Sequence, residues 1–150
     1  MLDRIADDDQ QDFKVKMMHA IWLTTSQIAQ LRSIANHALP NEACAFLIGK
    51  NEIVVKVLPM RNADNSPTIF SIDPEDVLSA YKHAESEQLD VIAIFHSHPG
   101  KPSPSKTDII FMELNPIAWL IYSTTEGRLN AFIYDEDAVK DVSIKIAAKE

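Results

Sequence analysis

The chain has 150 residues, of which 46% are hydrophobic, and it carries a formal net charge of −8 at pH 7. This length suits one domain with a buried core, and the acidic balance argues against nucleic acid as the main partner, because phosphate contacts need a basic surface. The single cysteine, Cys44, excludes an intrachain disulfide and a cysteine-based zinc site. No apolar run is long enough to cross a membrane and no signal-peptide core is present, so we expect a cytoplasmic protein.

The N-terminal segment differs in composition from the rest of the chain. Residues 1–12 contain five aspartates against one arginine, which accounts for half of the net negative charge. Such a segment offers few apolar side chains to a core. We therefore expect a flexible acidic extension over residues 1–14 and one domain over residues 15–150.

The first part of the domain predicts a helix followed by a β-hairpin. Thr24, with Gln27 three residues later, is typical of a capping box at a helix start, and Pro40 ends the helix. The apolar runs 43–49 and 53–59 flank a short polar turn and predict two antiparallel strands.

The middle of the chain predicts a loop, a short strand, a helix and a buried strand. A polar loop precedes residues 68–72, which we expect to form a short strand. Asp73 and Pro74 are a cap and a first-turn residue, and they begin a helix that extends to residue 89. The apolar run 91–95 follows as a buried strand.

The last part of the chain predicts a short helix and three strands. The helix begins near Ser105, residues 117–123 and 129–135 form a second hairpin, and residues 142–146 form a final strand. Strands before and after central helices favour an α/β domain, in which a mixed sheet is flanked by helices.

Two histidines stand at the end of the strand predicted over residues 91–95. Side chains alternate along a strand, so His96 and His98 project from one face while Ser97 points to the other. Zinc accepts histidine nitrogen and carboxylate oxygen, and a catalytic site keeps one position for water. Asp108 is a candidate third ligand if the chain folds back, a return that the proline-rich segment 99–104 favours.

A reading without metal is also open for these residues. A His-x-His pair often occurs by chance, and Ser105 with Asp108 fits a helix capping box without any chemistry. The two readings are compatible, because a capped helix start would hold Ser105 and Asp108 rigidly beside the histidines.

A family resemblance supports the metal reading. The stretch HSHPGKPSPSKTD resembles the signature of the JAMM (MPN+) zinc metalloprotease family, in which two histidines, a serine and an aspartate recur in this order. The upstream stretch PNEACAFLIG, residues 40–49, resembles the segment that carries the family's essential glutamate. The similarity runs from about His19 to Tyr134. It implies an MPN (JAB) domain, a cytidine-deaminase-like α/β fold with a curved mixed sheet. One spacing differs, since six residues separate His98 from Ser105 and the family usually has seven.

The resemblance also implies a role for each polar residue of the two motifs. His96, His98 and Asp108 would bind one zinc ion per chain. Glu42 would be the general base and acid that moves the proton of the attacking water. Ser105 would donate a hydrogen bond to that water or to the developing oxyanion.

The activity implied by the resemblance is hydrolysis of the amide bond after the C-terminal glycine of ubiquitin or of a ubiquitin-like or sulfur-carrier protein. Only twelve residues separate Met60 from Asp73, so the chain resembles the minimal prokaryotic, archaeal-type members, which lack substrate-gripping insertions. Two alternatives stay open at this point. The enzyme could trim a small group from the C-terminus of a carrier protein, or the domain could be a non-catalytic scaffold.

Overall fold

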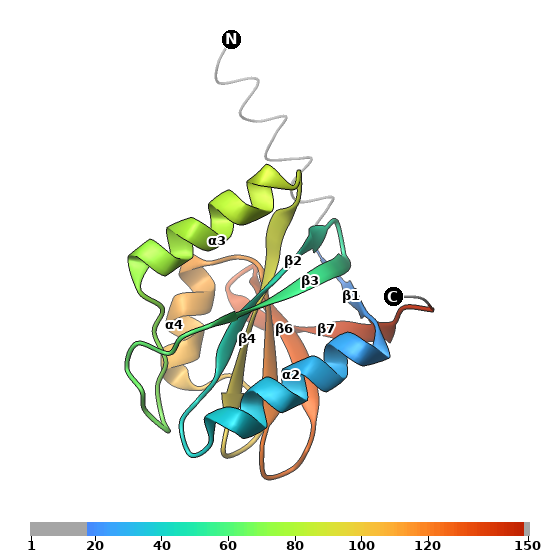
Figure 1. The fold of residues 1–150 in the computed structure, drawn as a ribbon. Helices are drawn as coiled ribbons and strands as arrows, with labels where there is room; N and C mark the ends of the chain where they lie inside the picture. Colours follow the sequence, from blue (N-terminus) through green and yellow to red (C-terminus); the bar gives the residue numbers. More distant parts are fainter. Residues whose placement is uncertain (1–17, 149–150) are drawn as a thin grey trace.

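The computed structural model describes residues 18–148, and within this range the chain forms seven strands and three helices (Figure 1). In chain order they are β1 (Ala20–Leu23), α2 (Thr25–Ala38), β2 (Cys44–Lys50), β3 (Ile53–Met60), α3 (Pro74–Ser86), β4 (Asp90–His98), α4 (Lys106–Leu114), β5 (Ala118–Ser123), β6 (Leu129–Asp135) and β7 (Ala138–Ile146). None of the three helices in the described range is long and apolar enough to cross a membrane. The extension expected over residues 1–14 lies outside the described residues.

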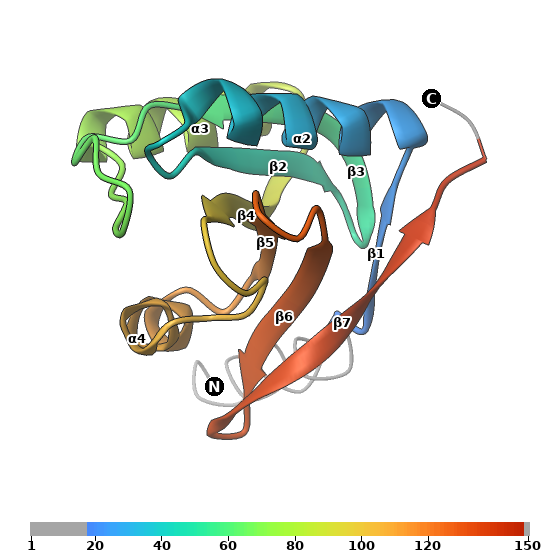
Figure 2. The ribbon, with the colours of Figure 1, turned by 90° about the horizontal axis from the view of Figure 1, so that it is seen from below.

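The strands form one mixed sheet that closes on itself. Its order is β1-β3-β2-β4-β5-β6-β7, and β7 pairs in parallel with β1 to complete the ring. Figure 2 shows the strands curving from β2 and β4 through β5 and β6 to β7, which returns to β1. The parallel pair β4 and β5 places His96 opposite Ile121 and His98 opposite Ser123. The carboxyl ends of two neighbouring strands therefore meet where the histidines lie.

Two hydrophobic clusters cover the two faces of the sheet, because apolar side chains alternate along its strands. On β2, Leu47 joins a cluster that includes Leu31 of α2. Its neighbours Phe46 and Ile48 join a second cluster with residues of α3 and with Met112 of α4. Since both faces are covered, β2 is apolar almost throughout and does not alternate with polar residues. We call the face that carries α3 and α4 the outer face.

Most elements agree with the sequence-based expectations. The capping box of Thr24 and Gln27, the cap at Asp73 and both hairpins are present, and the mixed sheet flanked by helices is confirmed. The prediction of a short strand over residues 68–72 is wrong, because these residues form a loop with no strand partner. Instead, the Ser71 carbonyl accepts a hydrogen bond from the Ala63 amide within the same loop.

Candidate metal centre

Strand β4 supplies the two histidines from its buried end. His96 is fully buried and His98 is half-buried, and both project from the outer face of the sheet. The ring of Phe70 stacks on His96 with ring centroids 4.6 Å apart, and Trp119 meets the same ring edge-on. The Nδ1 atom of His96 has no hydrogen-bond partner among residues 18–148. By contrast, the Nδ1 atom of His98 lies 3.2 Å from the Lys101 carbonyl oxygen.

The loop that follows His98 is held by its carbonyl groups. The Lys101 carbonyl oxygen faces His98. The carbonyl oxygen of Pro99 accepts a hydrogen bond from the Thr125 hydroxyl at 2.8 Å, and that of Pro102 accepts one from the side-chain amide of Asn130 at 3.1 Å. Proline has no backbone N–H to donate, but its backbone carbonyl oxygen remains a good acceptor. The six-residue loop is therefore long enough to return the chain to the histidines at the start of α4.

Helix α4 begins with a capping box that also orients the candidate ligand Asp108. The Ser105 hydroxyl oxygen accepts from the Asp108 amide at 3.0 Å, and the Ser105 amide donates to Oδ2 of Asp108 at 2.9 Å. This same Oδ2 atom lies 3.2 Å from Nε2 of His96 and 3.1 Å from Nε2 of His98. The cap and the cluster thus share one carboxylate oxygen, and the two readings of this motif hold together.

The donor atoms of these three residues fit a metal ion. The Nε2 atoms of the two histidines are 2.9 Å apart, so the three donor atoms form a small triangle. Zinc–nitrogen and zinc–oxygen bonds of about 2.0–2.1 Å in a tetrahedron would separate neighbouring ligand atoms by roughly 3.3 Å. Two imidazoles and a carboxylate are also a donor set that zinc accepts. A cation among them would offset the crowding of three electron-rich atoms.

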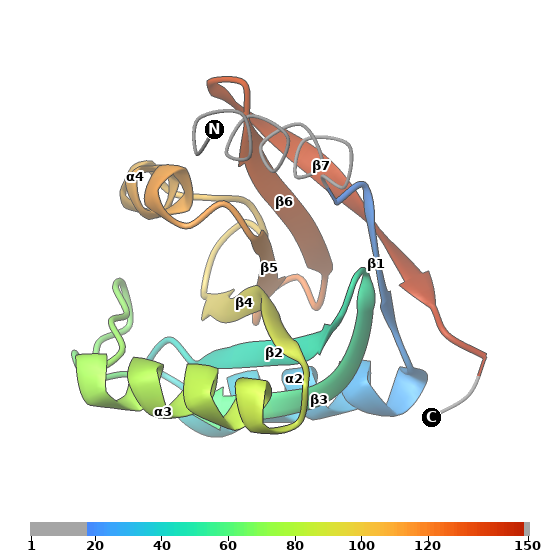
Figure 3. The ribbon, with the colours of Figure 1, turned by 90° about the horizontal axis from the view of Figure 1, so that it is seen from above.

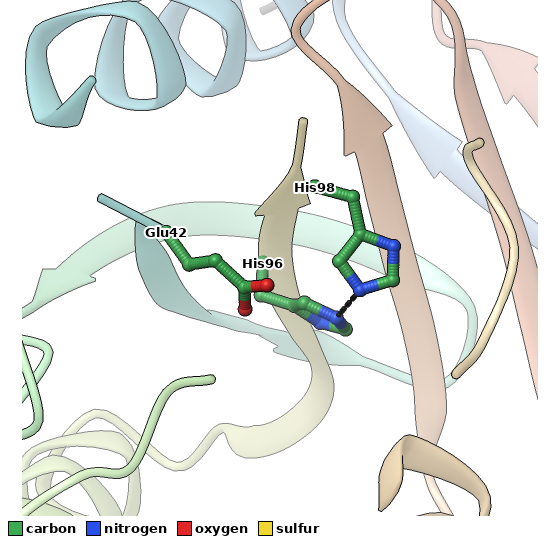
Figure 4. Close-up of side chains that lie close together, drawn as sticks. All are labelled: Glu42, His96 and His98. Atoms are coloured by element: carbon green, nitrogen blue, oxygen red, sulfur yellow. Dashed lines mark hydrogen bonds between the residues drawn. The ribbon is translucent and has the colours of Figure 1, made fainter. Parts of the chain in front are cut away.

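Glu42 approaches the histidines from a different part of the chain. It lies between α2 and β2, is 5% exposed, and extends its carboxylate toward the two imidazoles (Figure 4). Glu42, His96 and His98 form a group that could hold a metal ion, because each offers a ligand atom within 4.8 Å of the others. In the sequence Glu42 is a single acid shortly after a helix, and the tertiary structure buries it.

Burial and charge set the protonation of the cluster. Complete burial lowers the pKa of His96, which favours the neutral form that binds metals. Burial would lower the pKa of His98 as well, but its hydrogen bond to Asp108 and the charge of that carboxylate outweigh burial and raise it. Because a metal ion binds the neutral imidazole and competes with its protonation, metal binding should weaken at low pH.

The two carboxylates of the cluster respond in opposite directions. Burial raises the pKa of Glu42 from 4.5 to about 7, with the positive charge of His98 opposing and the negative charge of Asp108 adding to the effect. Burial alone would raise the pKa of Asp108, but hydrogen bonds from the two histidines and from the Ser105 amide hold it well below its ordinary value. Two carboxylates with separated pKa values suit two different roles.

The raised pKa of Glu42 predicts how the stability of the metal-free protein depends on pH. Because the folded-state pKa is near 7, the contribution of Glu42 to stability is fully present below pH 4.5 and is lost as pH rises through 7. Glu42→Gln cannot ionise, so in chelator it should be more stable than the wild type at pH 8, by up to about 3 kcal/mol. The advantage should shrink toward pH 5. Thermal unfolding at both pH values measures this, with the exposed Glu85→Gln as a control, and an equal difference at both values would contradict it.

Ser97 supports the candidate site, and the sequence did not single it out for this role. Its hydroxyl oxygen accepts from the Ala43 amide at 2.8 Å, and its amide donates to the Ala43 carbonyl oxygen at 3.1 Å. Ser97 is buried, and it ties the residue after Glu42 to the strand that carries both histidines. Its place between two candidate ligands was visible in the sequence, but its partner 54 residues away was not.

A mainly apolar cavity lies beside the candidate metal centre. A cavity of about 260 Å³ lies on the outer face between α3, α4 and the loop after β3. Figure 3 shows this loop turned toward α4. The lining of the cavity is mainly apolar and aromatic. Phe70 and Trp119 belong both to the cavity wall and to the surroundings of His96. An apolar group bound here would therefore lie next to the candidate metal centre.

Two further residues complete the site description. Ser105 is exposed at the start of α4, where its hydroxyl accepts one hydrogen bond and keeps its own proton available. Cys44 is fully buried, and burial with the neighbouring charge of Glu42 raises the pKa of its thiol to about 12. Cys44 is therefore not a nucleophile at neutral pH. The structure thus gathers His96, His98, Asp108 and Glu42, while the ligand and catalytic roles stay predictions.

The fold and the cluster together define a mixed α/β domain with a candidate metal centre at the carboxyl ends of two parallel strands. Residues 24–134 match the family profile described as prokaryotic homologs of the JAB domain. The chain therefore belongs to this family, and the family predicted from the two motifs is confirmed.

Comparisons with individual proteins agree with this membership. The chain is 42% identical over 107 residues to a desampylase from Pyrococcus furiosus. The aligned region covers 70% of this chain and 76% of that protein. It is 33% identical over 73 residues to a CysO-cysteine peptidase from Mycobacterium tuberculosis. This aligned region covers 47% of this chain and 50% of that protein. A solution structure of a protein from Desulfitobacterium hafniense is similar with a TM-score of 0.76 and 34% identity, over 86% of this chain and 94% of that one.

Proposed function

We propose that this protein is a zinc-dependent isopeptidase, which hydrolyses the amide bond after the C-terminal glycine of a ubiquitin-like or sulfur-carrier protein. The convergence of two imidazoles and two carboxylates of different pKa at one strand end carries this proposal. The similarity to a desampylase supports the reaction class.

In this proposal His96, His98 and Asp108 bind the zinc ion. Zinc would act as a Lewis acid on the scissile carbonyl and make water a nucleophile near neutral pH. Asp108 is the third ligand because its Oδ2 atom is the one that faces both Nε2 atoms. The Ser105 amide holds this oxygen in place, as supporting residues of metal ligands commonly do.

Glu42 is the general base in this proposal. Its carboxylate faces the histidines, and a pKa of about 7 lets it accept a proton and release it again near neutral pH. It would take a proton from the attacking water and return it to the leaving amine. Ser105 would donate its free hydroxyl proton to the oxyanion of the tetrahedral intermediate, an interaction that typically contributes about 10²–10³ in rate.

The cavity beside His96 is the proposed place for the substrate tail. A C-terminal tail that ends in glycine can approach a buried centre closely, because glycine has no side chain. An apolar side chain a few residues upstream would then enter the cavity near Phe70 and Tyr81. The cavity volume of about 260 Å³ is sufficient for one large side chain.

The experiment that tests this function is cleavage of defined substrates. The zinc-loaded protein should cleave a ubiquitin-like protein from a C-terminal fusion or from a lysine ε-amino linkage, because both present the same amide after glycine. A strong chelator should abolish cleavage and added zinc should restore it. Mass spectrometry of the products checks the cleavage position. Intact substrates across a panel of archaeal, bacterial and eukaryotic ubiquitin-like proteins would contradict the proposal.

A second candidate function uses the same chemistry on a smaller leaving group. The similarity to a CysO-cysteine peptidase favours removal of a single amino acid from the C-terminus of a carrier protein. The two functions differ in the mass of the released amine, so the same mass spectrometry separates them. A non-catalytic scaffold is the least favoured reading, because all five polar residues of the two motifs are present.

A further inference from the structure

The backbone of Glu42 is hydrogen-bonded to the loop between β3 and α3. Glu42 lies in no helix or strand, so no regular ladder fixes it. Its amide donates to the carbonyl oxygen of Ser66 at 2.8 Å, and its carbonyl oxygen accepts from Nδ2 of Asn62 at 3.0 Å. Both partners belong to residues 61–73 between β3 and α3, which we call the 61–73 loop. The position of the Glu42 backbone therefore depends on this loop.

The side chain of Asn62 organises the 61–73 loop. Besides Glu42, its Nδ2 atom donates to the Ile69 carbonyl oxygen at 3.2 Å. Its Oδ1 atom accepts from the amides of Asp64 and Ser71, at 3.0 and 3.2 Å. Most residues of the loop are exposed, so packing contributes little to its shape. Asn62 thus connects the start of the loop, its end and the backbone of Glu42.

The same loop also reaches the histidines. It carries Phe70, whose ring stacks on His96. The loop therefore contacts the candidate base through its backbone and a candidate ligand through an aromatic ring. A change in the loop would move Glu42 relative to His96, which is the relation that proton transfer depends on.

We propose that Asn62 is a positioning residue, which holds the 61–73 loop against Glu42 and so places the carboxylate for proton transfer. The proposal rests on the function proposed above, in which Glu42 is the general base. Asn62 acts through the backbone of Glu42 and not on the substrate. Since a displacement of about 1 Å can cost about 100-fold in rate, a single lost hydrogen bond at this point is enough to matter.

The chemistry of the asparagine amide provides two informative variants. Asn62→Asp keeps an oxygen that can accept from the amides of Asp64 and Ser71 but loses the donor to the Glu42 carbonyl. Asn62→Ala loses donor and acceptor together. Asn65→Gly is the matched control, because among residues 18–148 the Asn65 side chain bonds only the Asn41 side chain at the surface, and glycine keeps the backbone amide that donates to the Asn62 carbonyl oxygen. Asn65 has a φ of 49°, a conformation that glycine adopts without strain.

The experiment measures amide exchange of Glu42 by NMR beside zinc content, kcat and KM on a ubiquitin-like fusion, for the full chain. Both Asn62 variants should accelerate exchange of the Glu42 amide by at least about tenfold, because opening the loop breaks its bond to Ser66. They should lower kcat by about 10–100-fold while zinc content stays near that of the wild type. Asn65→Gly should leave exchange and kcat within about twofold.

Several results would overturn the proposal. Wild-type exchange or wild-type kcat in Asn62→Ala would show that Asn62 does not hold the base. A fall in kcat that merely follows a loss of zinc or of folded protein would assign Asn62 a structural role. If the wild type cleaves no substrate, the proposed function fails, and the exchange rate of the Glu42 amide alone then decides whether Asn62 positions its backbone.

Discussion

Replacing Glu42 by glutamine is expected to lower kcat by about 10²–10⁴-fold, the usual contribution of a general acid–base catalyst. Glutamine preserves the shape of the side chain but cannot accept the proton of the attacking water. Because Asp108 and not Glu42 shares an oxygen between both histidines, zinc should stay bound. The measurement is turnover on a cleaved fusion together with metal content of the same sample.

This variant also separates two arrangements of the metal centre. Glu42 lies close enough to the histidines to be a ligand in its own right. If Glu42→Gln loses its zinc, Glu42 belongs to the ligand set, and the assignment as base is wrong. Near-normal turnover with zinc retained would equally contradict the assignment. Glu85→Gln, which changes an exposed glutamate on α3, is the control for the loss of one carboxylate.

Removing a histidine or carboxylate ligand should instead abolish zinc binding and activity together. In His98→Ala only two ligands remain of the proposed three, and we expect zinc affinity to fall by more than about 100-fold, beyond the effect typical of supporting residues. Asp108→Asn should behave similarly, because an amide is a weaker zinc ligand than a carboxylate. Competition with a chelating dye measures the affinity, and turnover is followed in parallel.

Asparagine at position 108 preserves the helix cap, so a change in zinc affinity cannot be attributed to loss of the cap. Its side-chain oxygen can still accept from the Ser105 amide, whereas Asp108→Ala would also cost about 1 kcal/mol of stability through the lost cap. His83→Ala is the control histidine, since His83 lies on α3 and faces Lys56. Full zinc affinity in His98→Ala or Asp108→Asn would show that the ligand set is wrong.

The local features of this protein could be predicted from its sequence. The capping boxes at Thr24 and Ser105, the apolar β4 and both hairpins rest on residues within a few positions of each other. The same holds for the shared face of His96 and His98, because the alternation of a strand decides it. A polar motif at a strand end therefore identified the place of the candidate site before any fold was known.

The tertiary structure decided the features that join distant parts of the chain. The four residues of β1 are too few for a recognisable pattern, yet they pair with β7 and close the sheet. Residues 68–72 looked like a strand, but the hydrogen bonds of Asn62 and the stacking of Phe70 on His96 keep them in a loop.

The sequence by itself determined the residue types of the candidate site, the strand that carries the histidines and the helix start that carries Asp108, because local patterns encode each of these. Only the tertiary structure decided that Glu42 is buried, that its pKa is raised to about 7, and that Ser97 and Asn62 hold its segment. The physical reason is that burial and hydrogen-bond partners depend on neighbours in space, and for Glu42 these neighbours are 20 or more residues away along the chain.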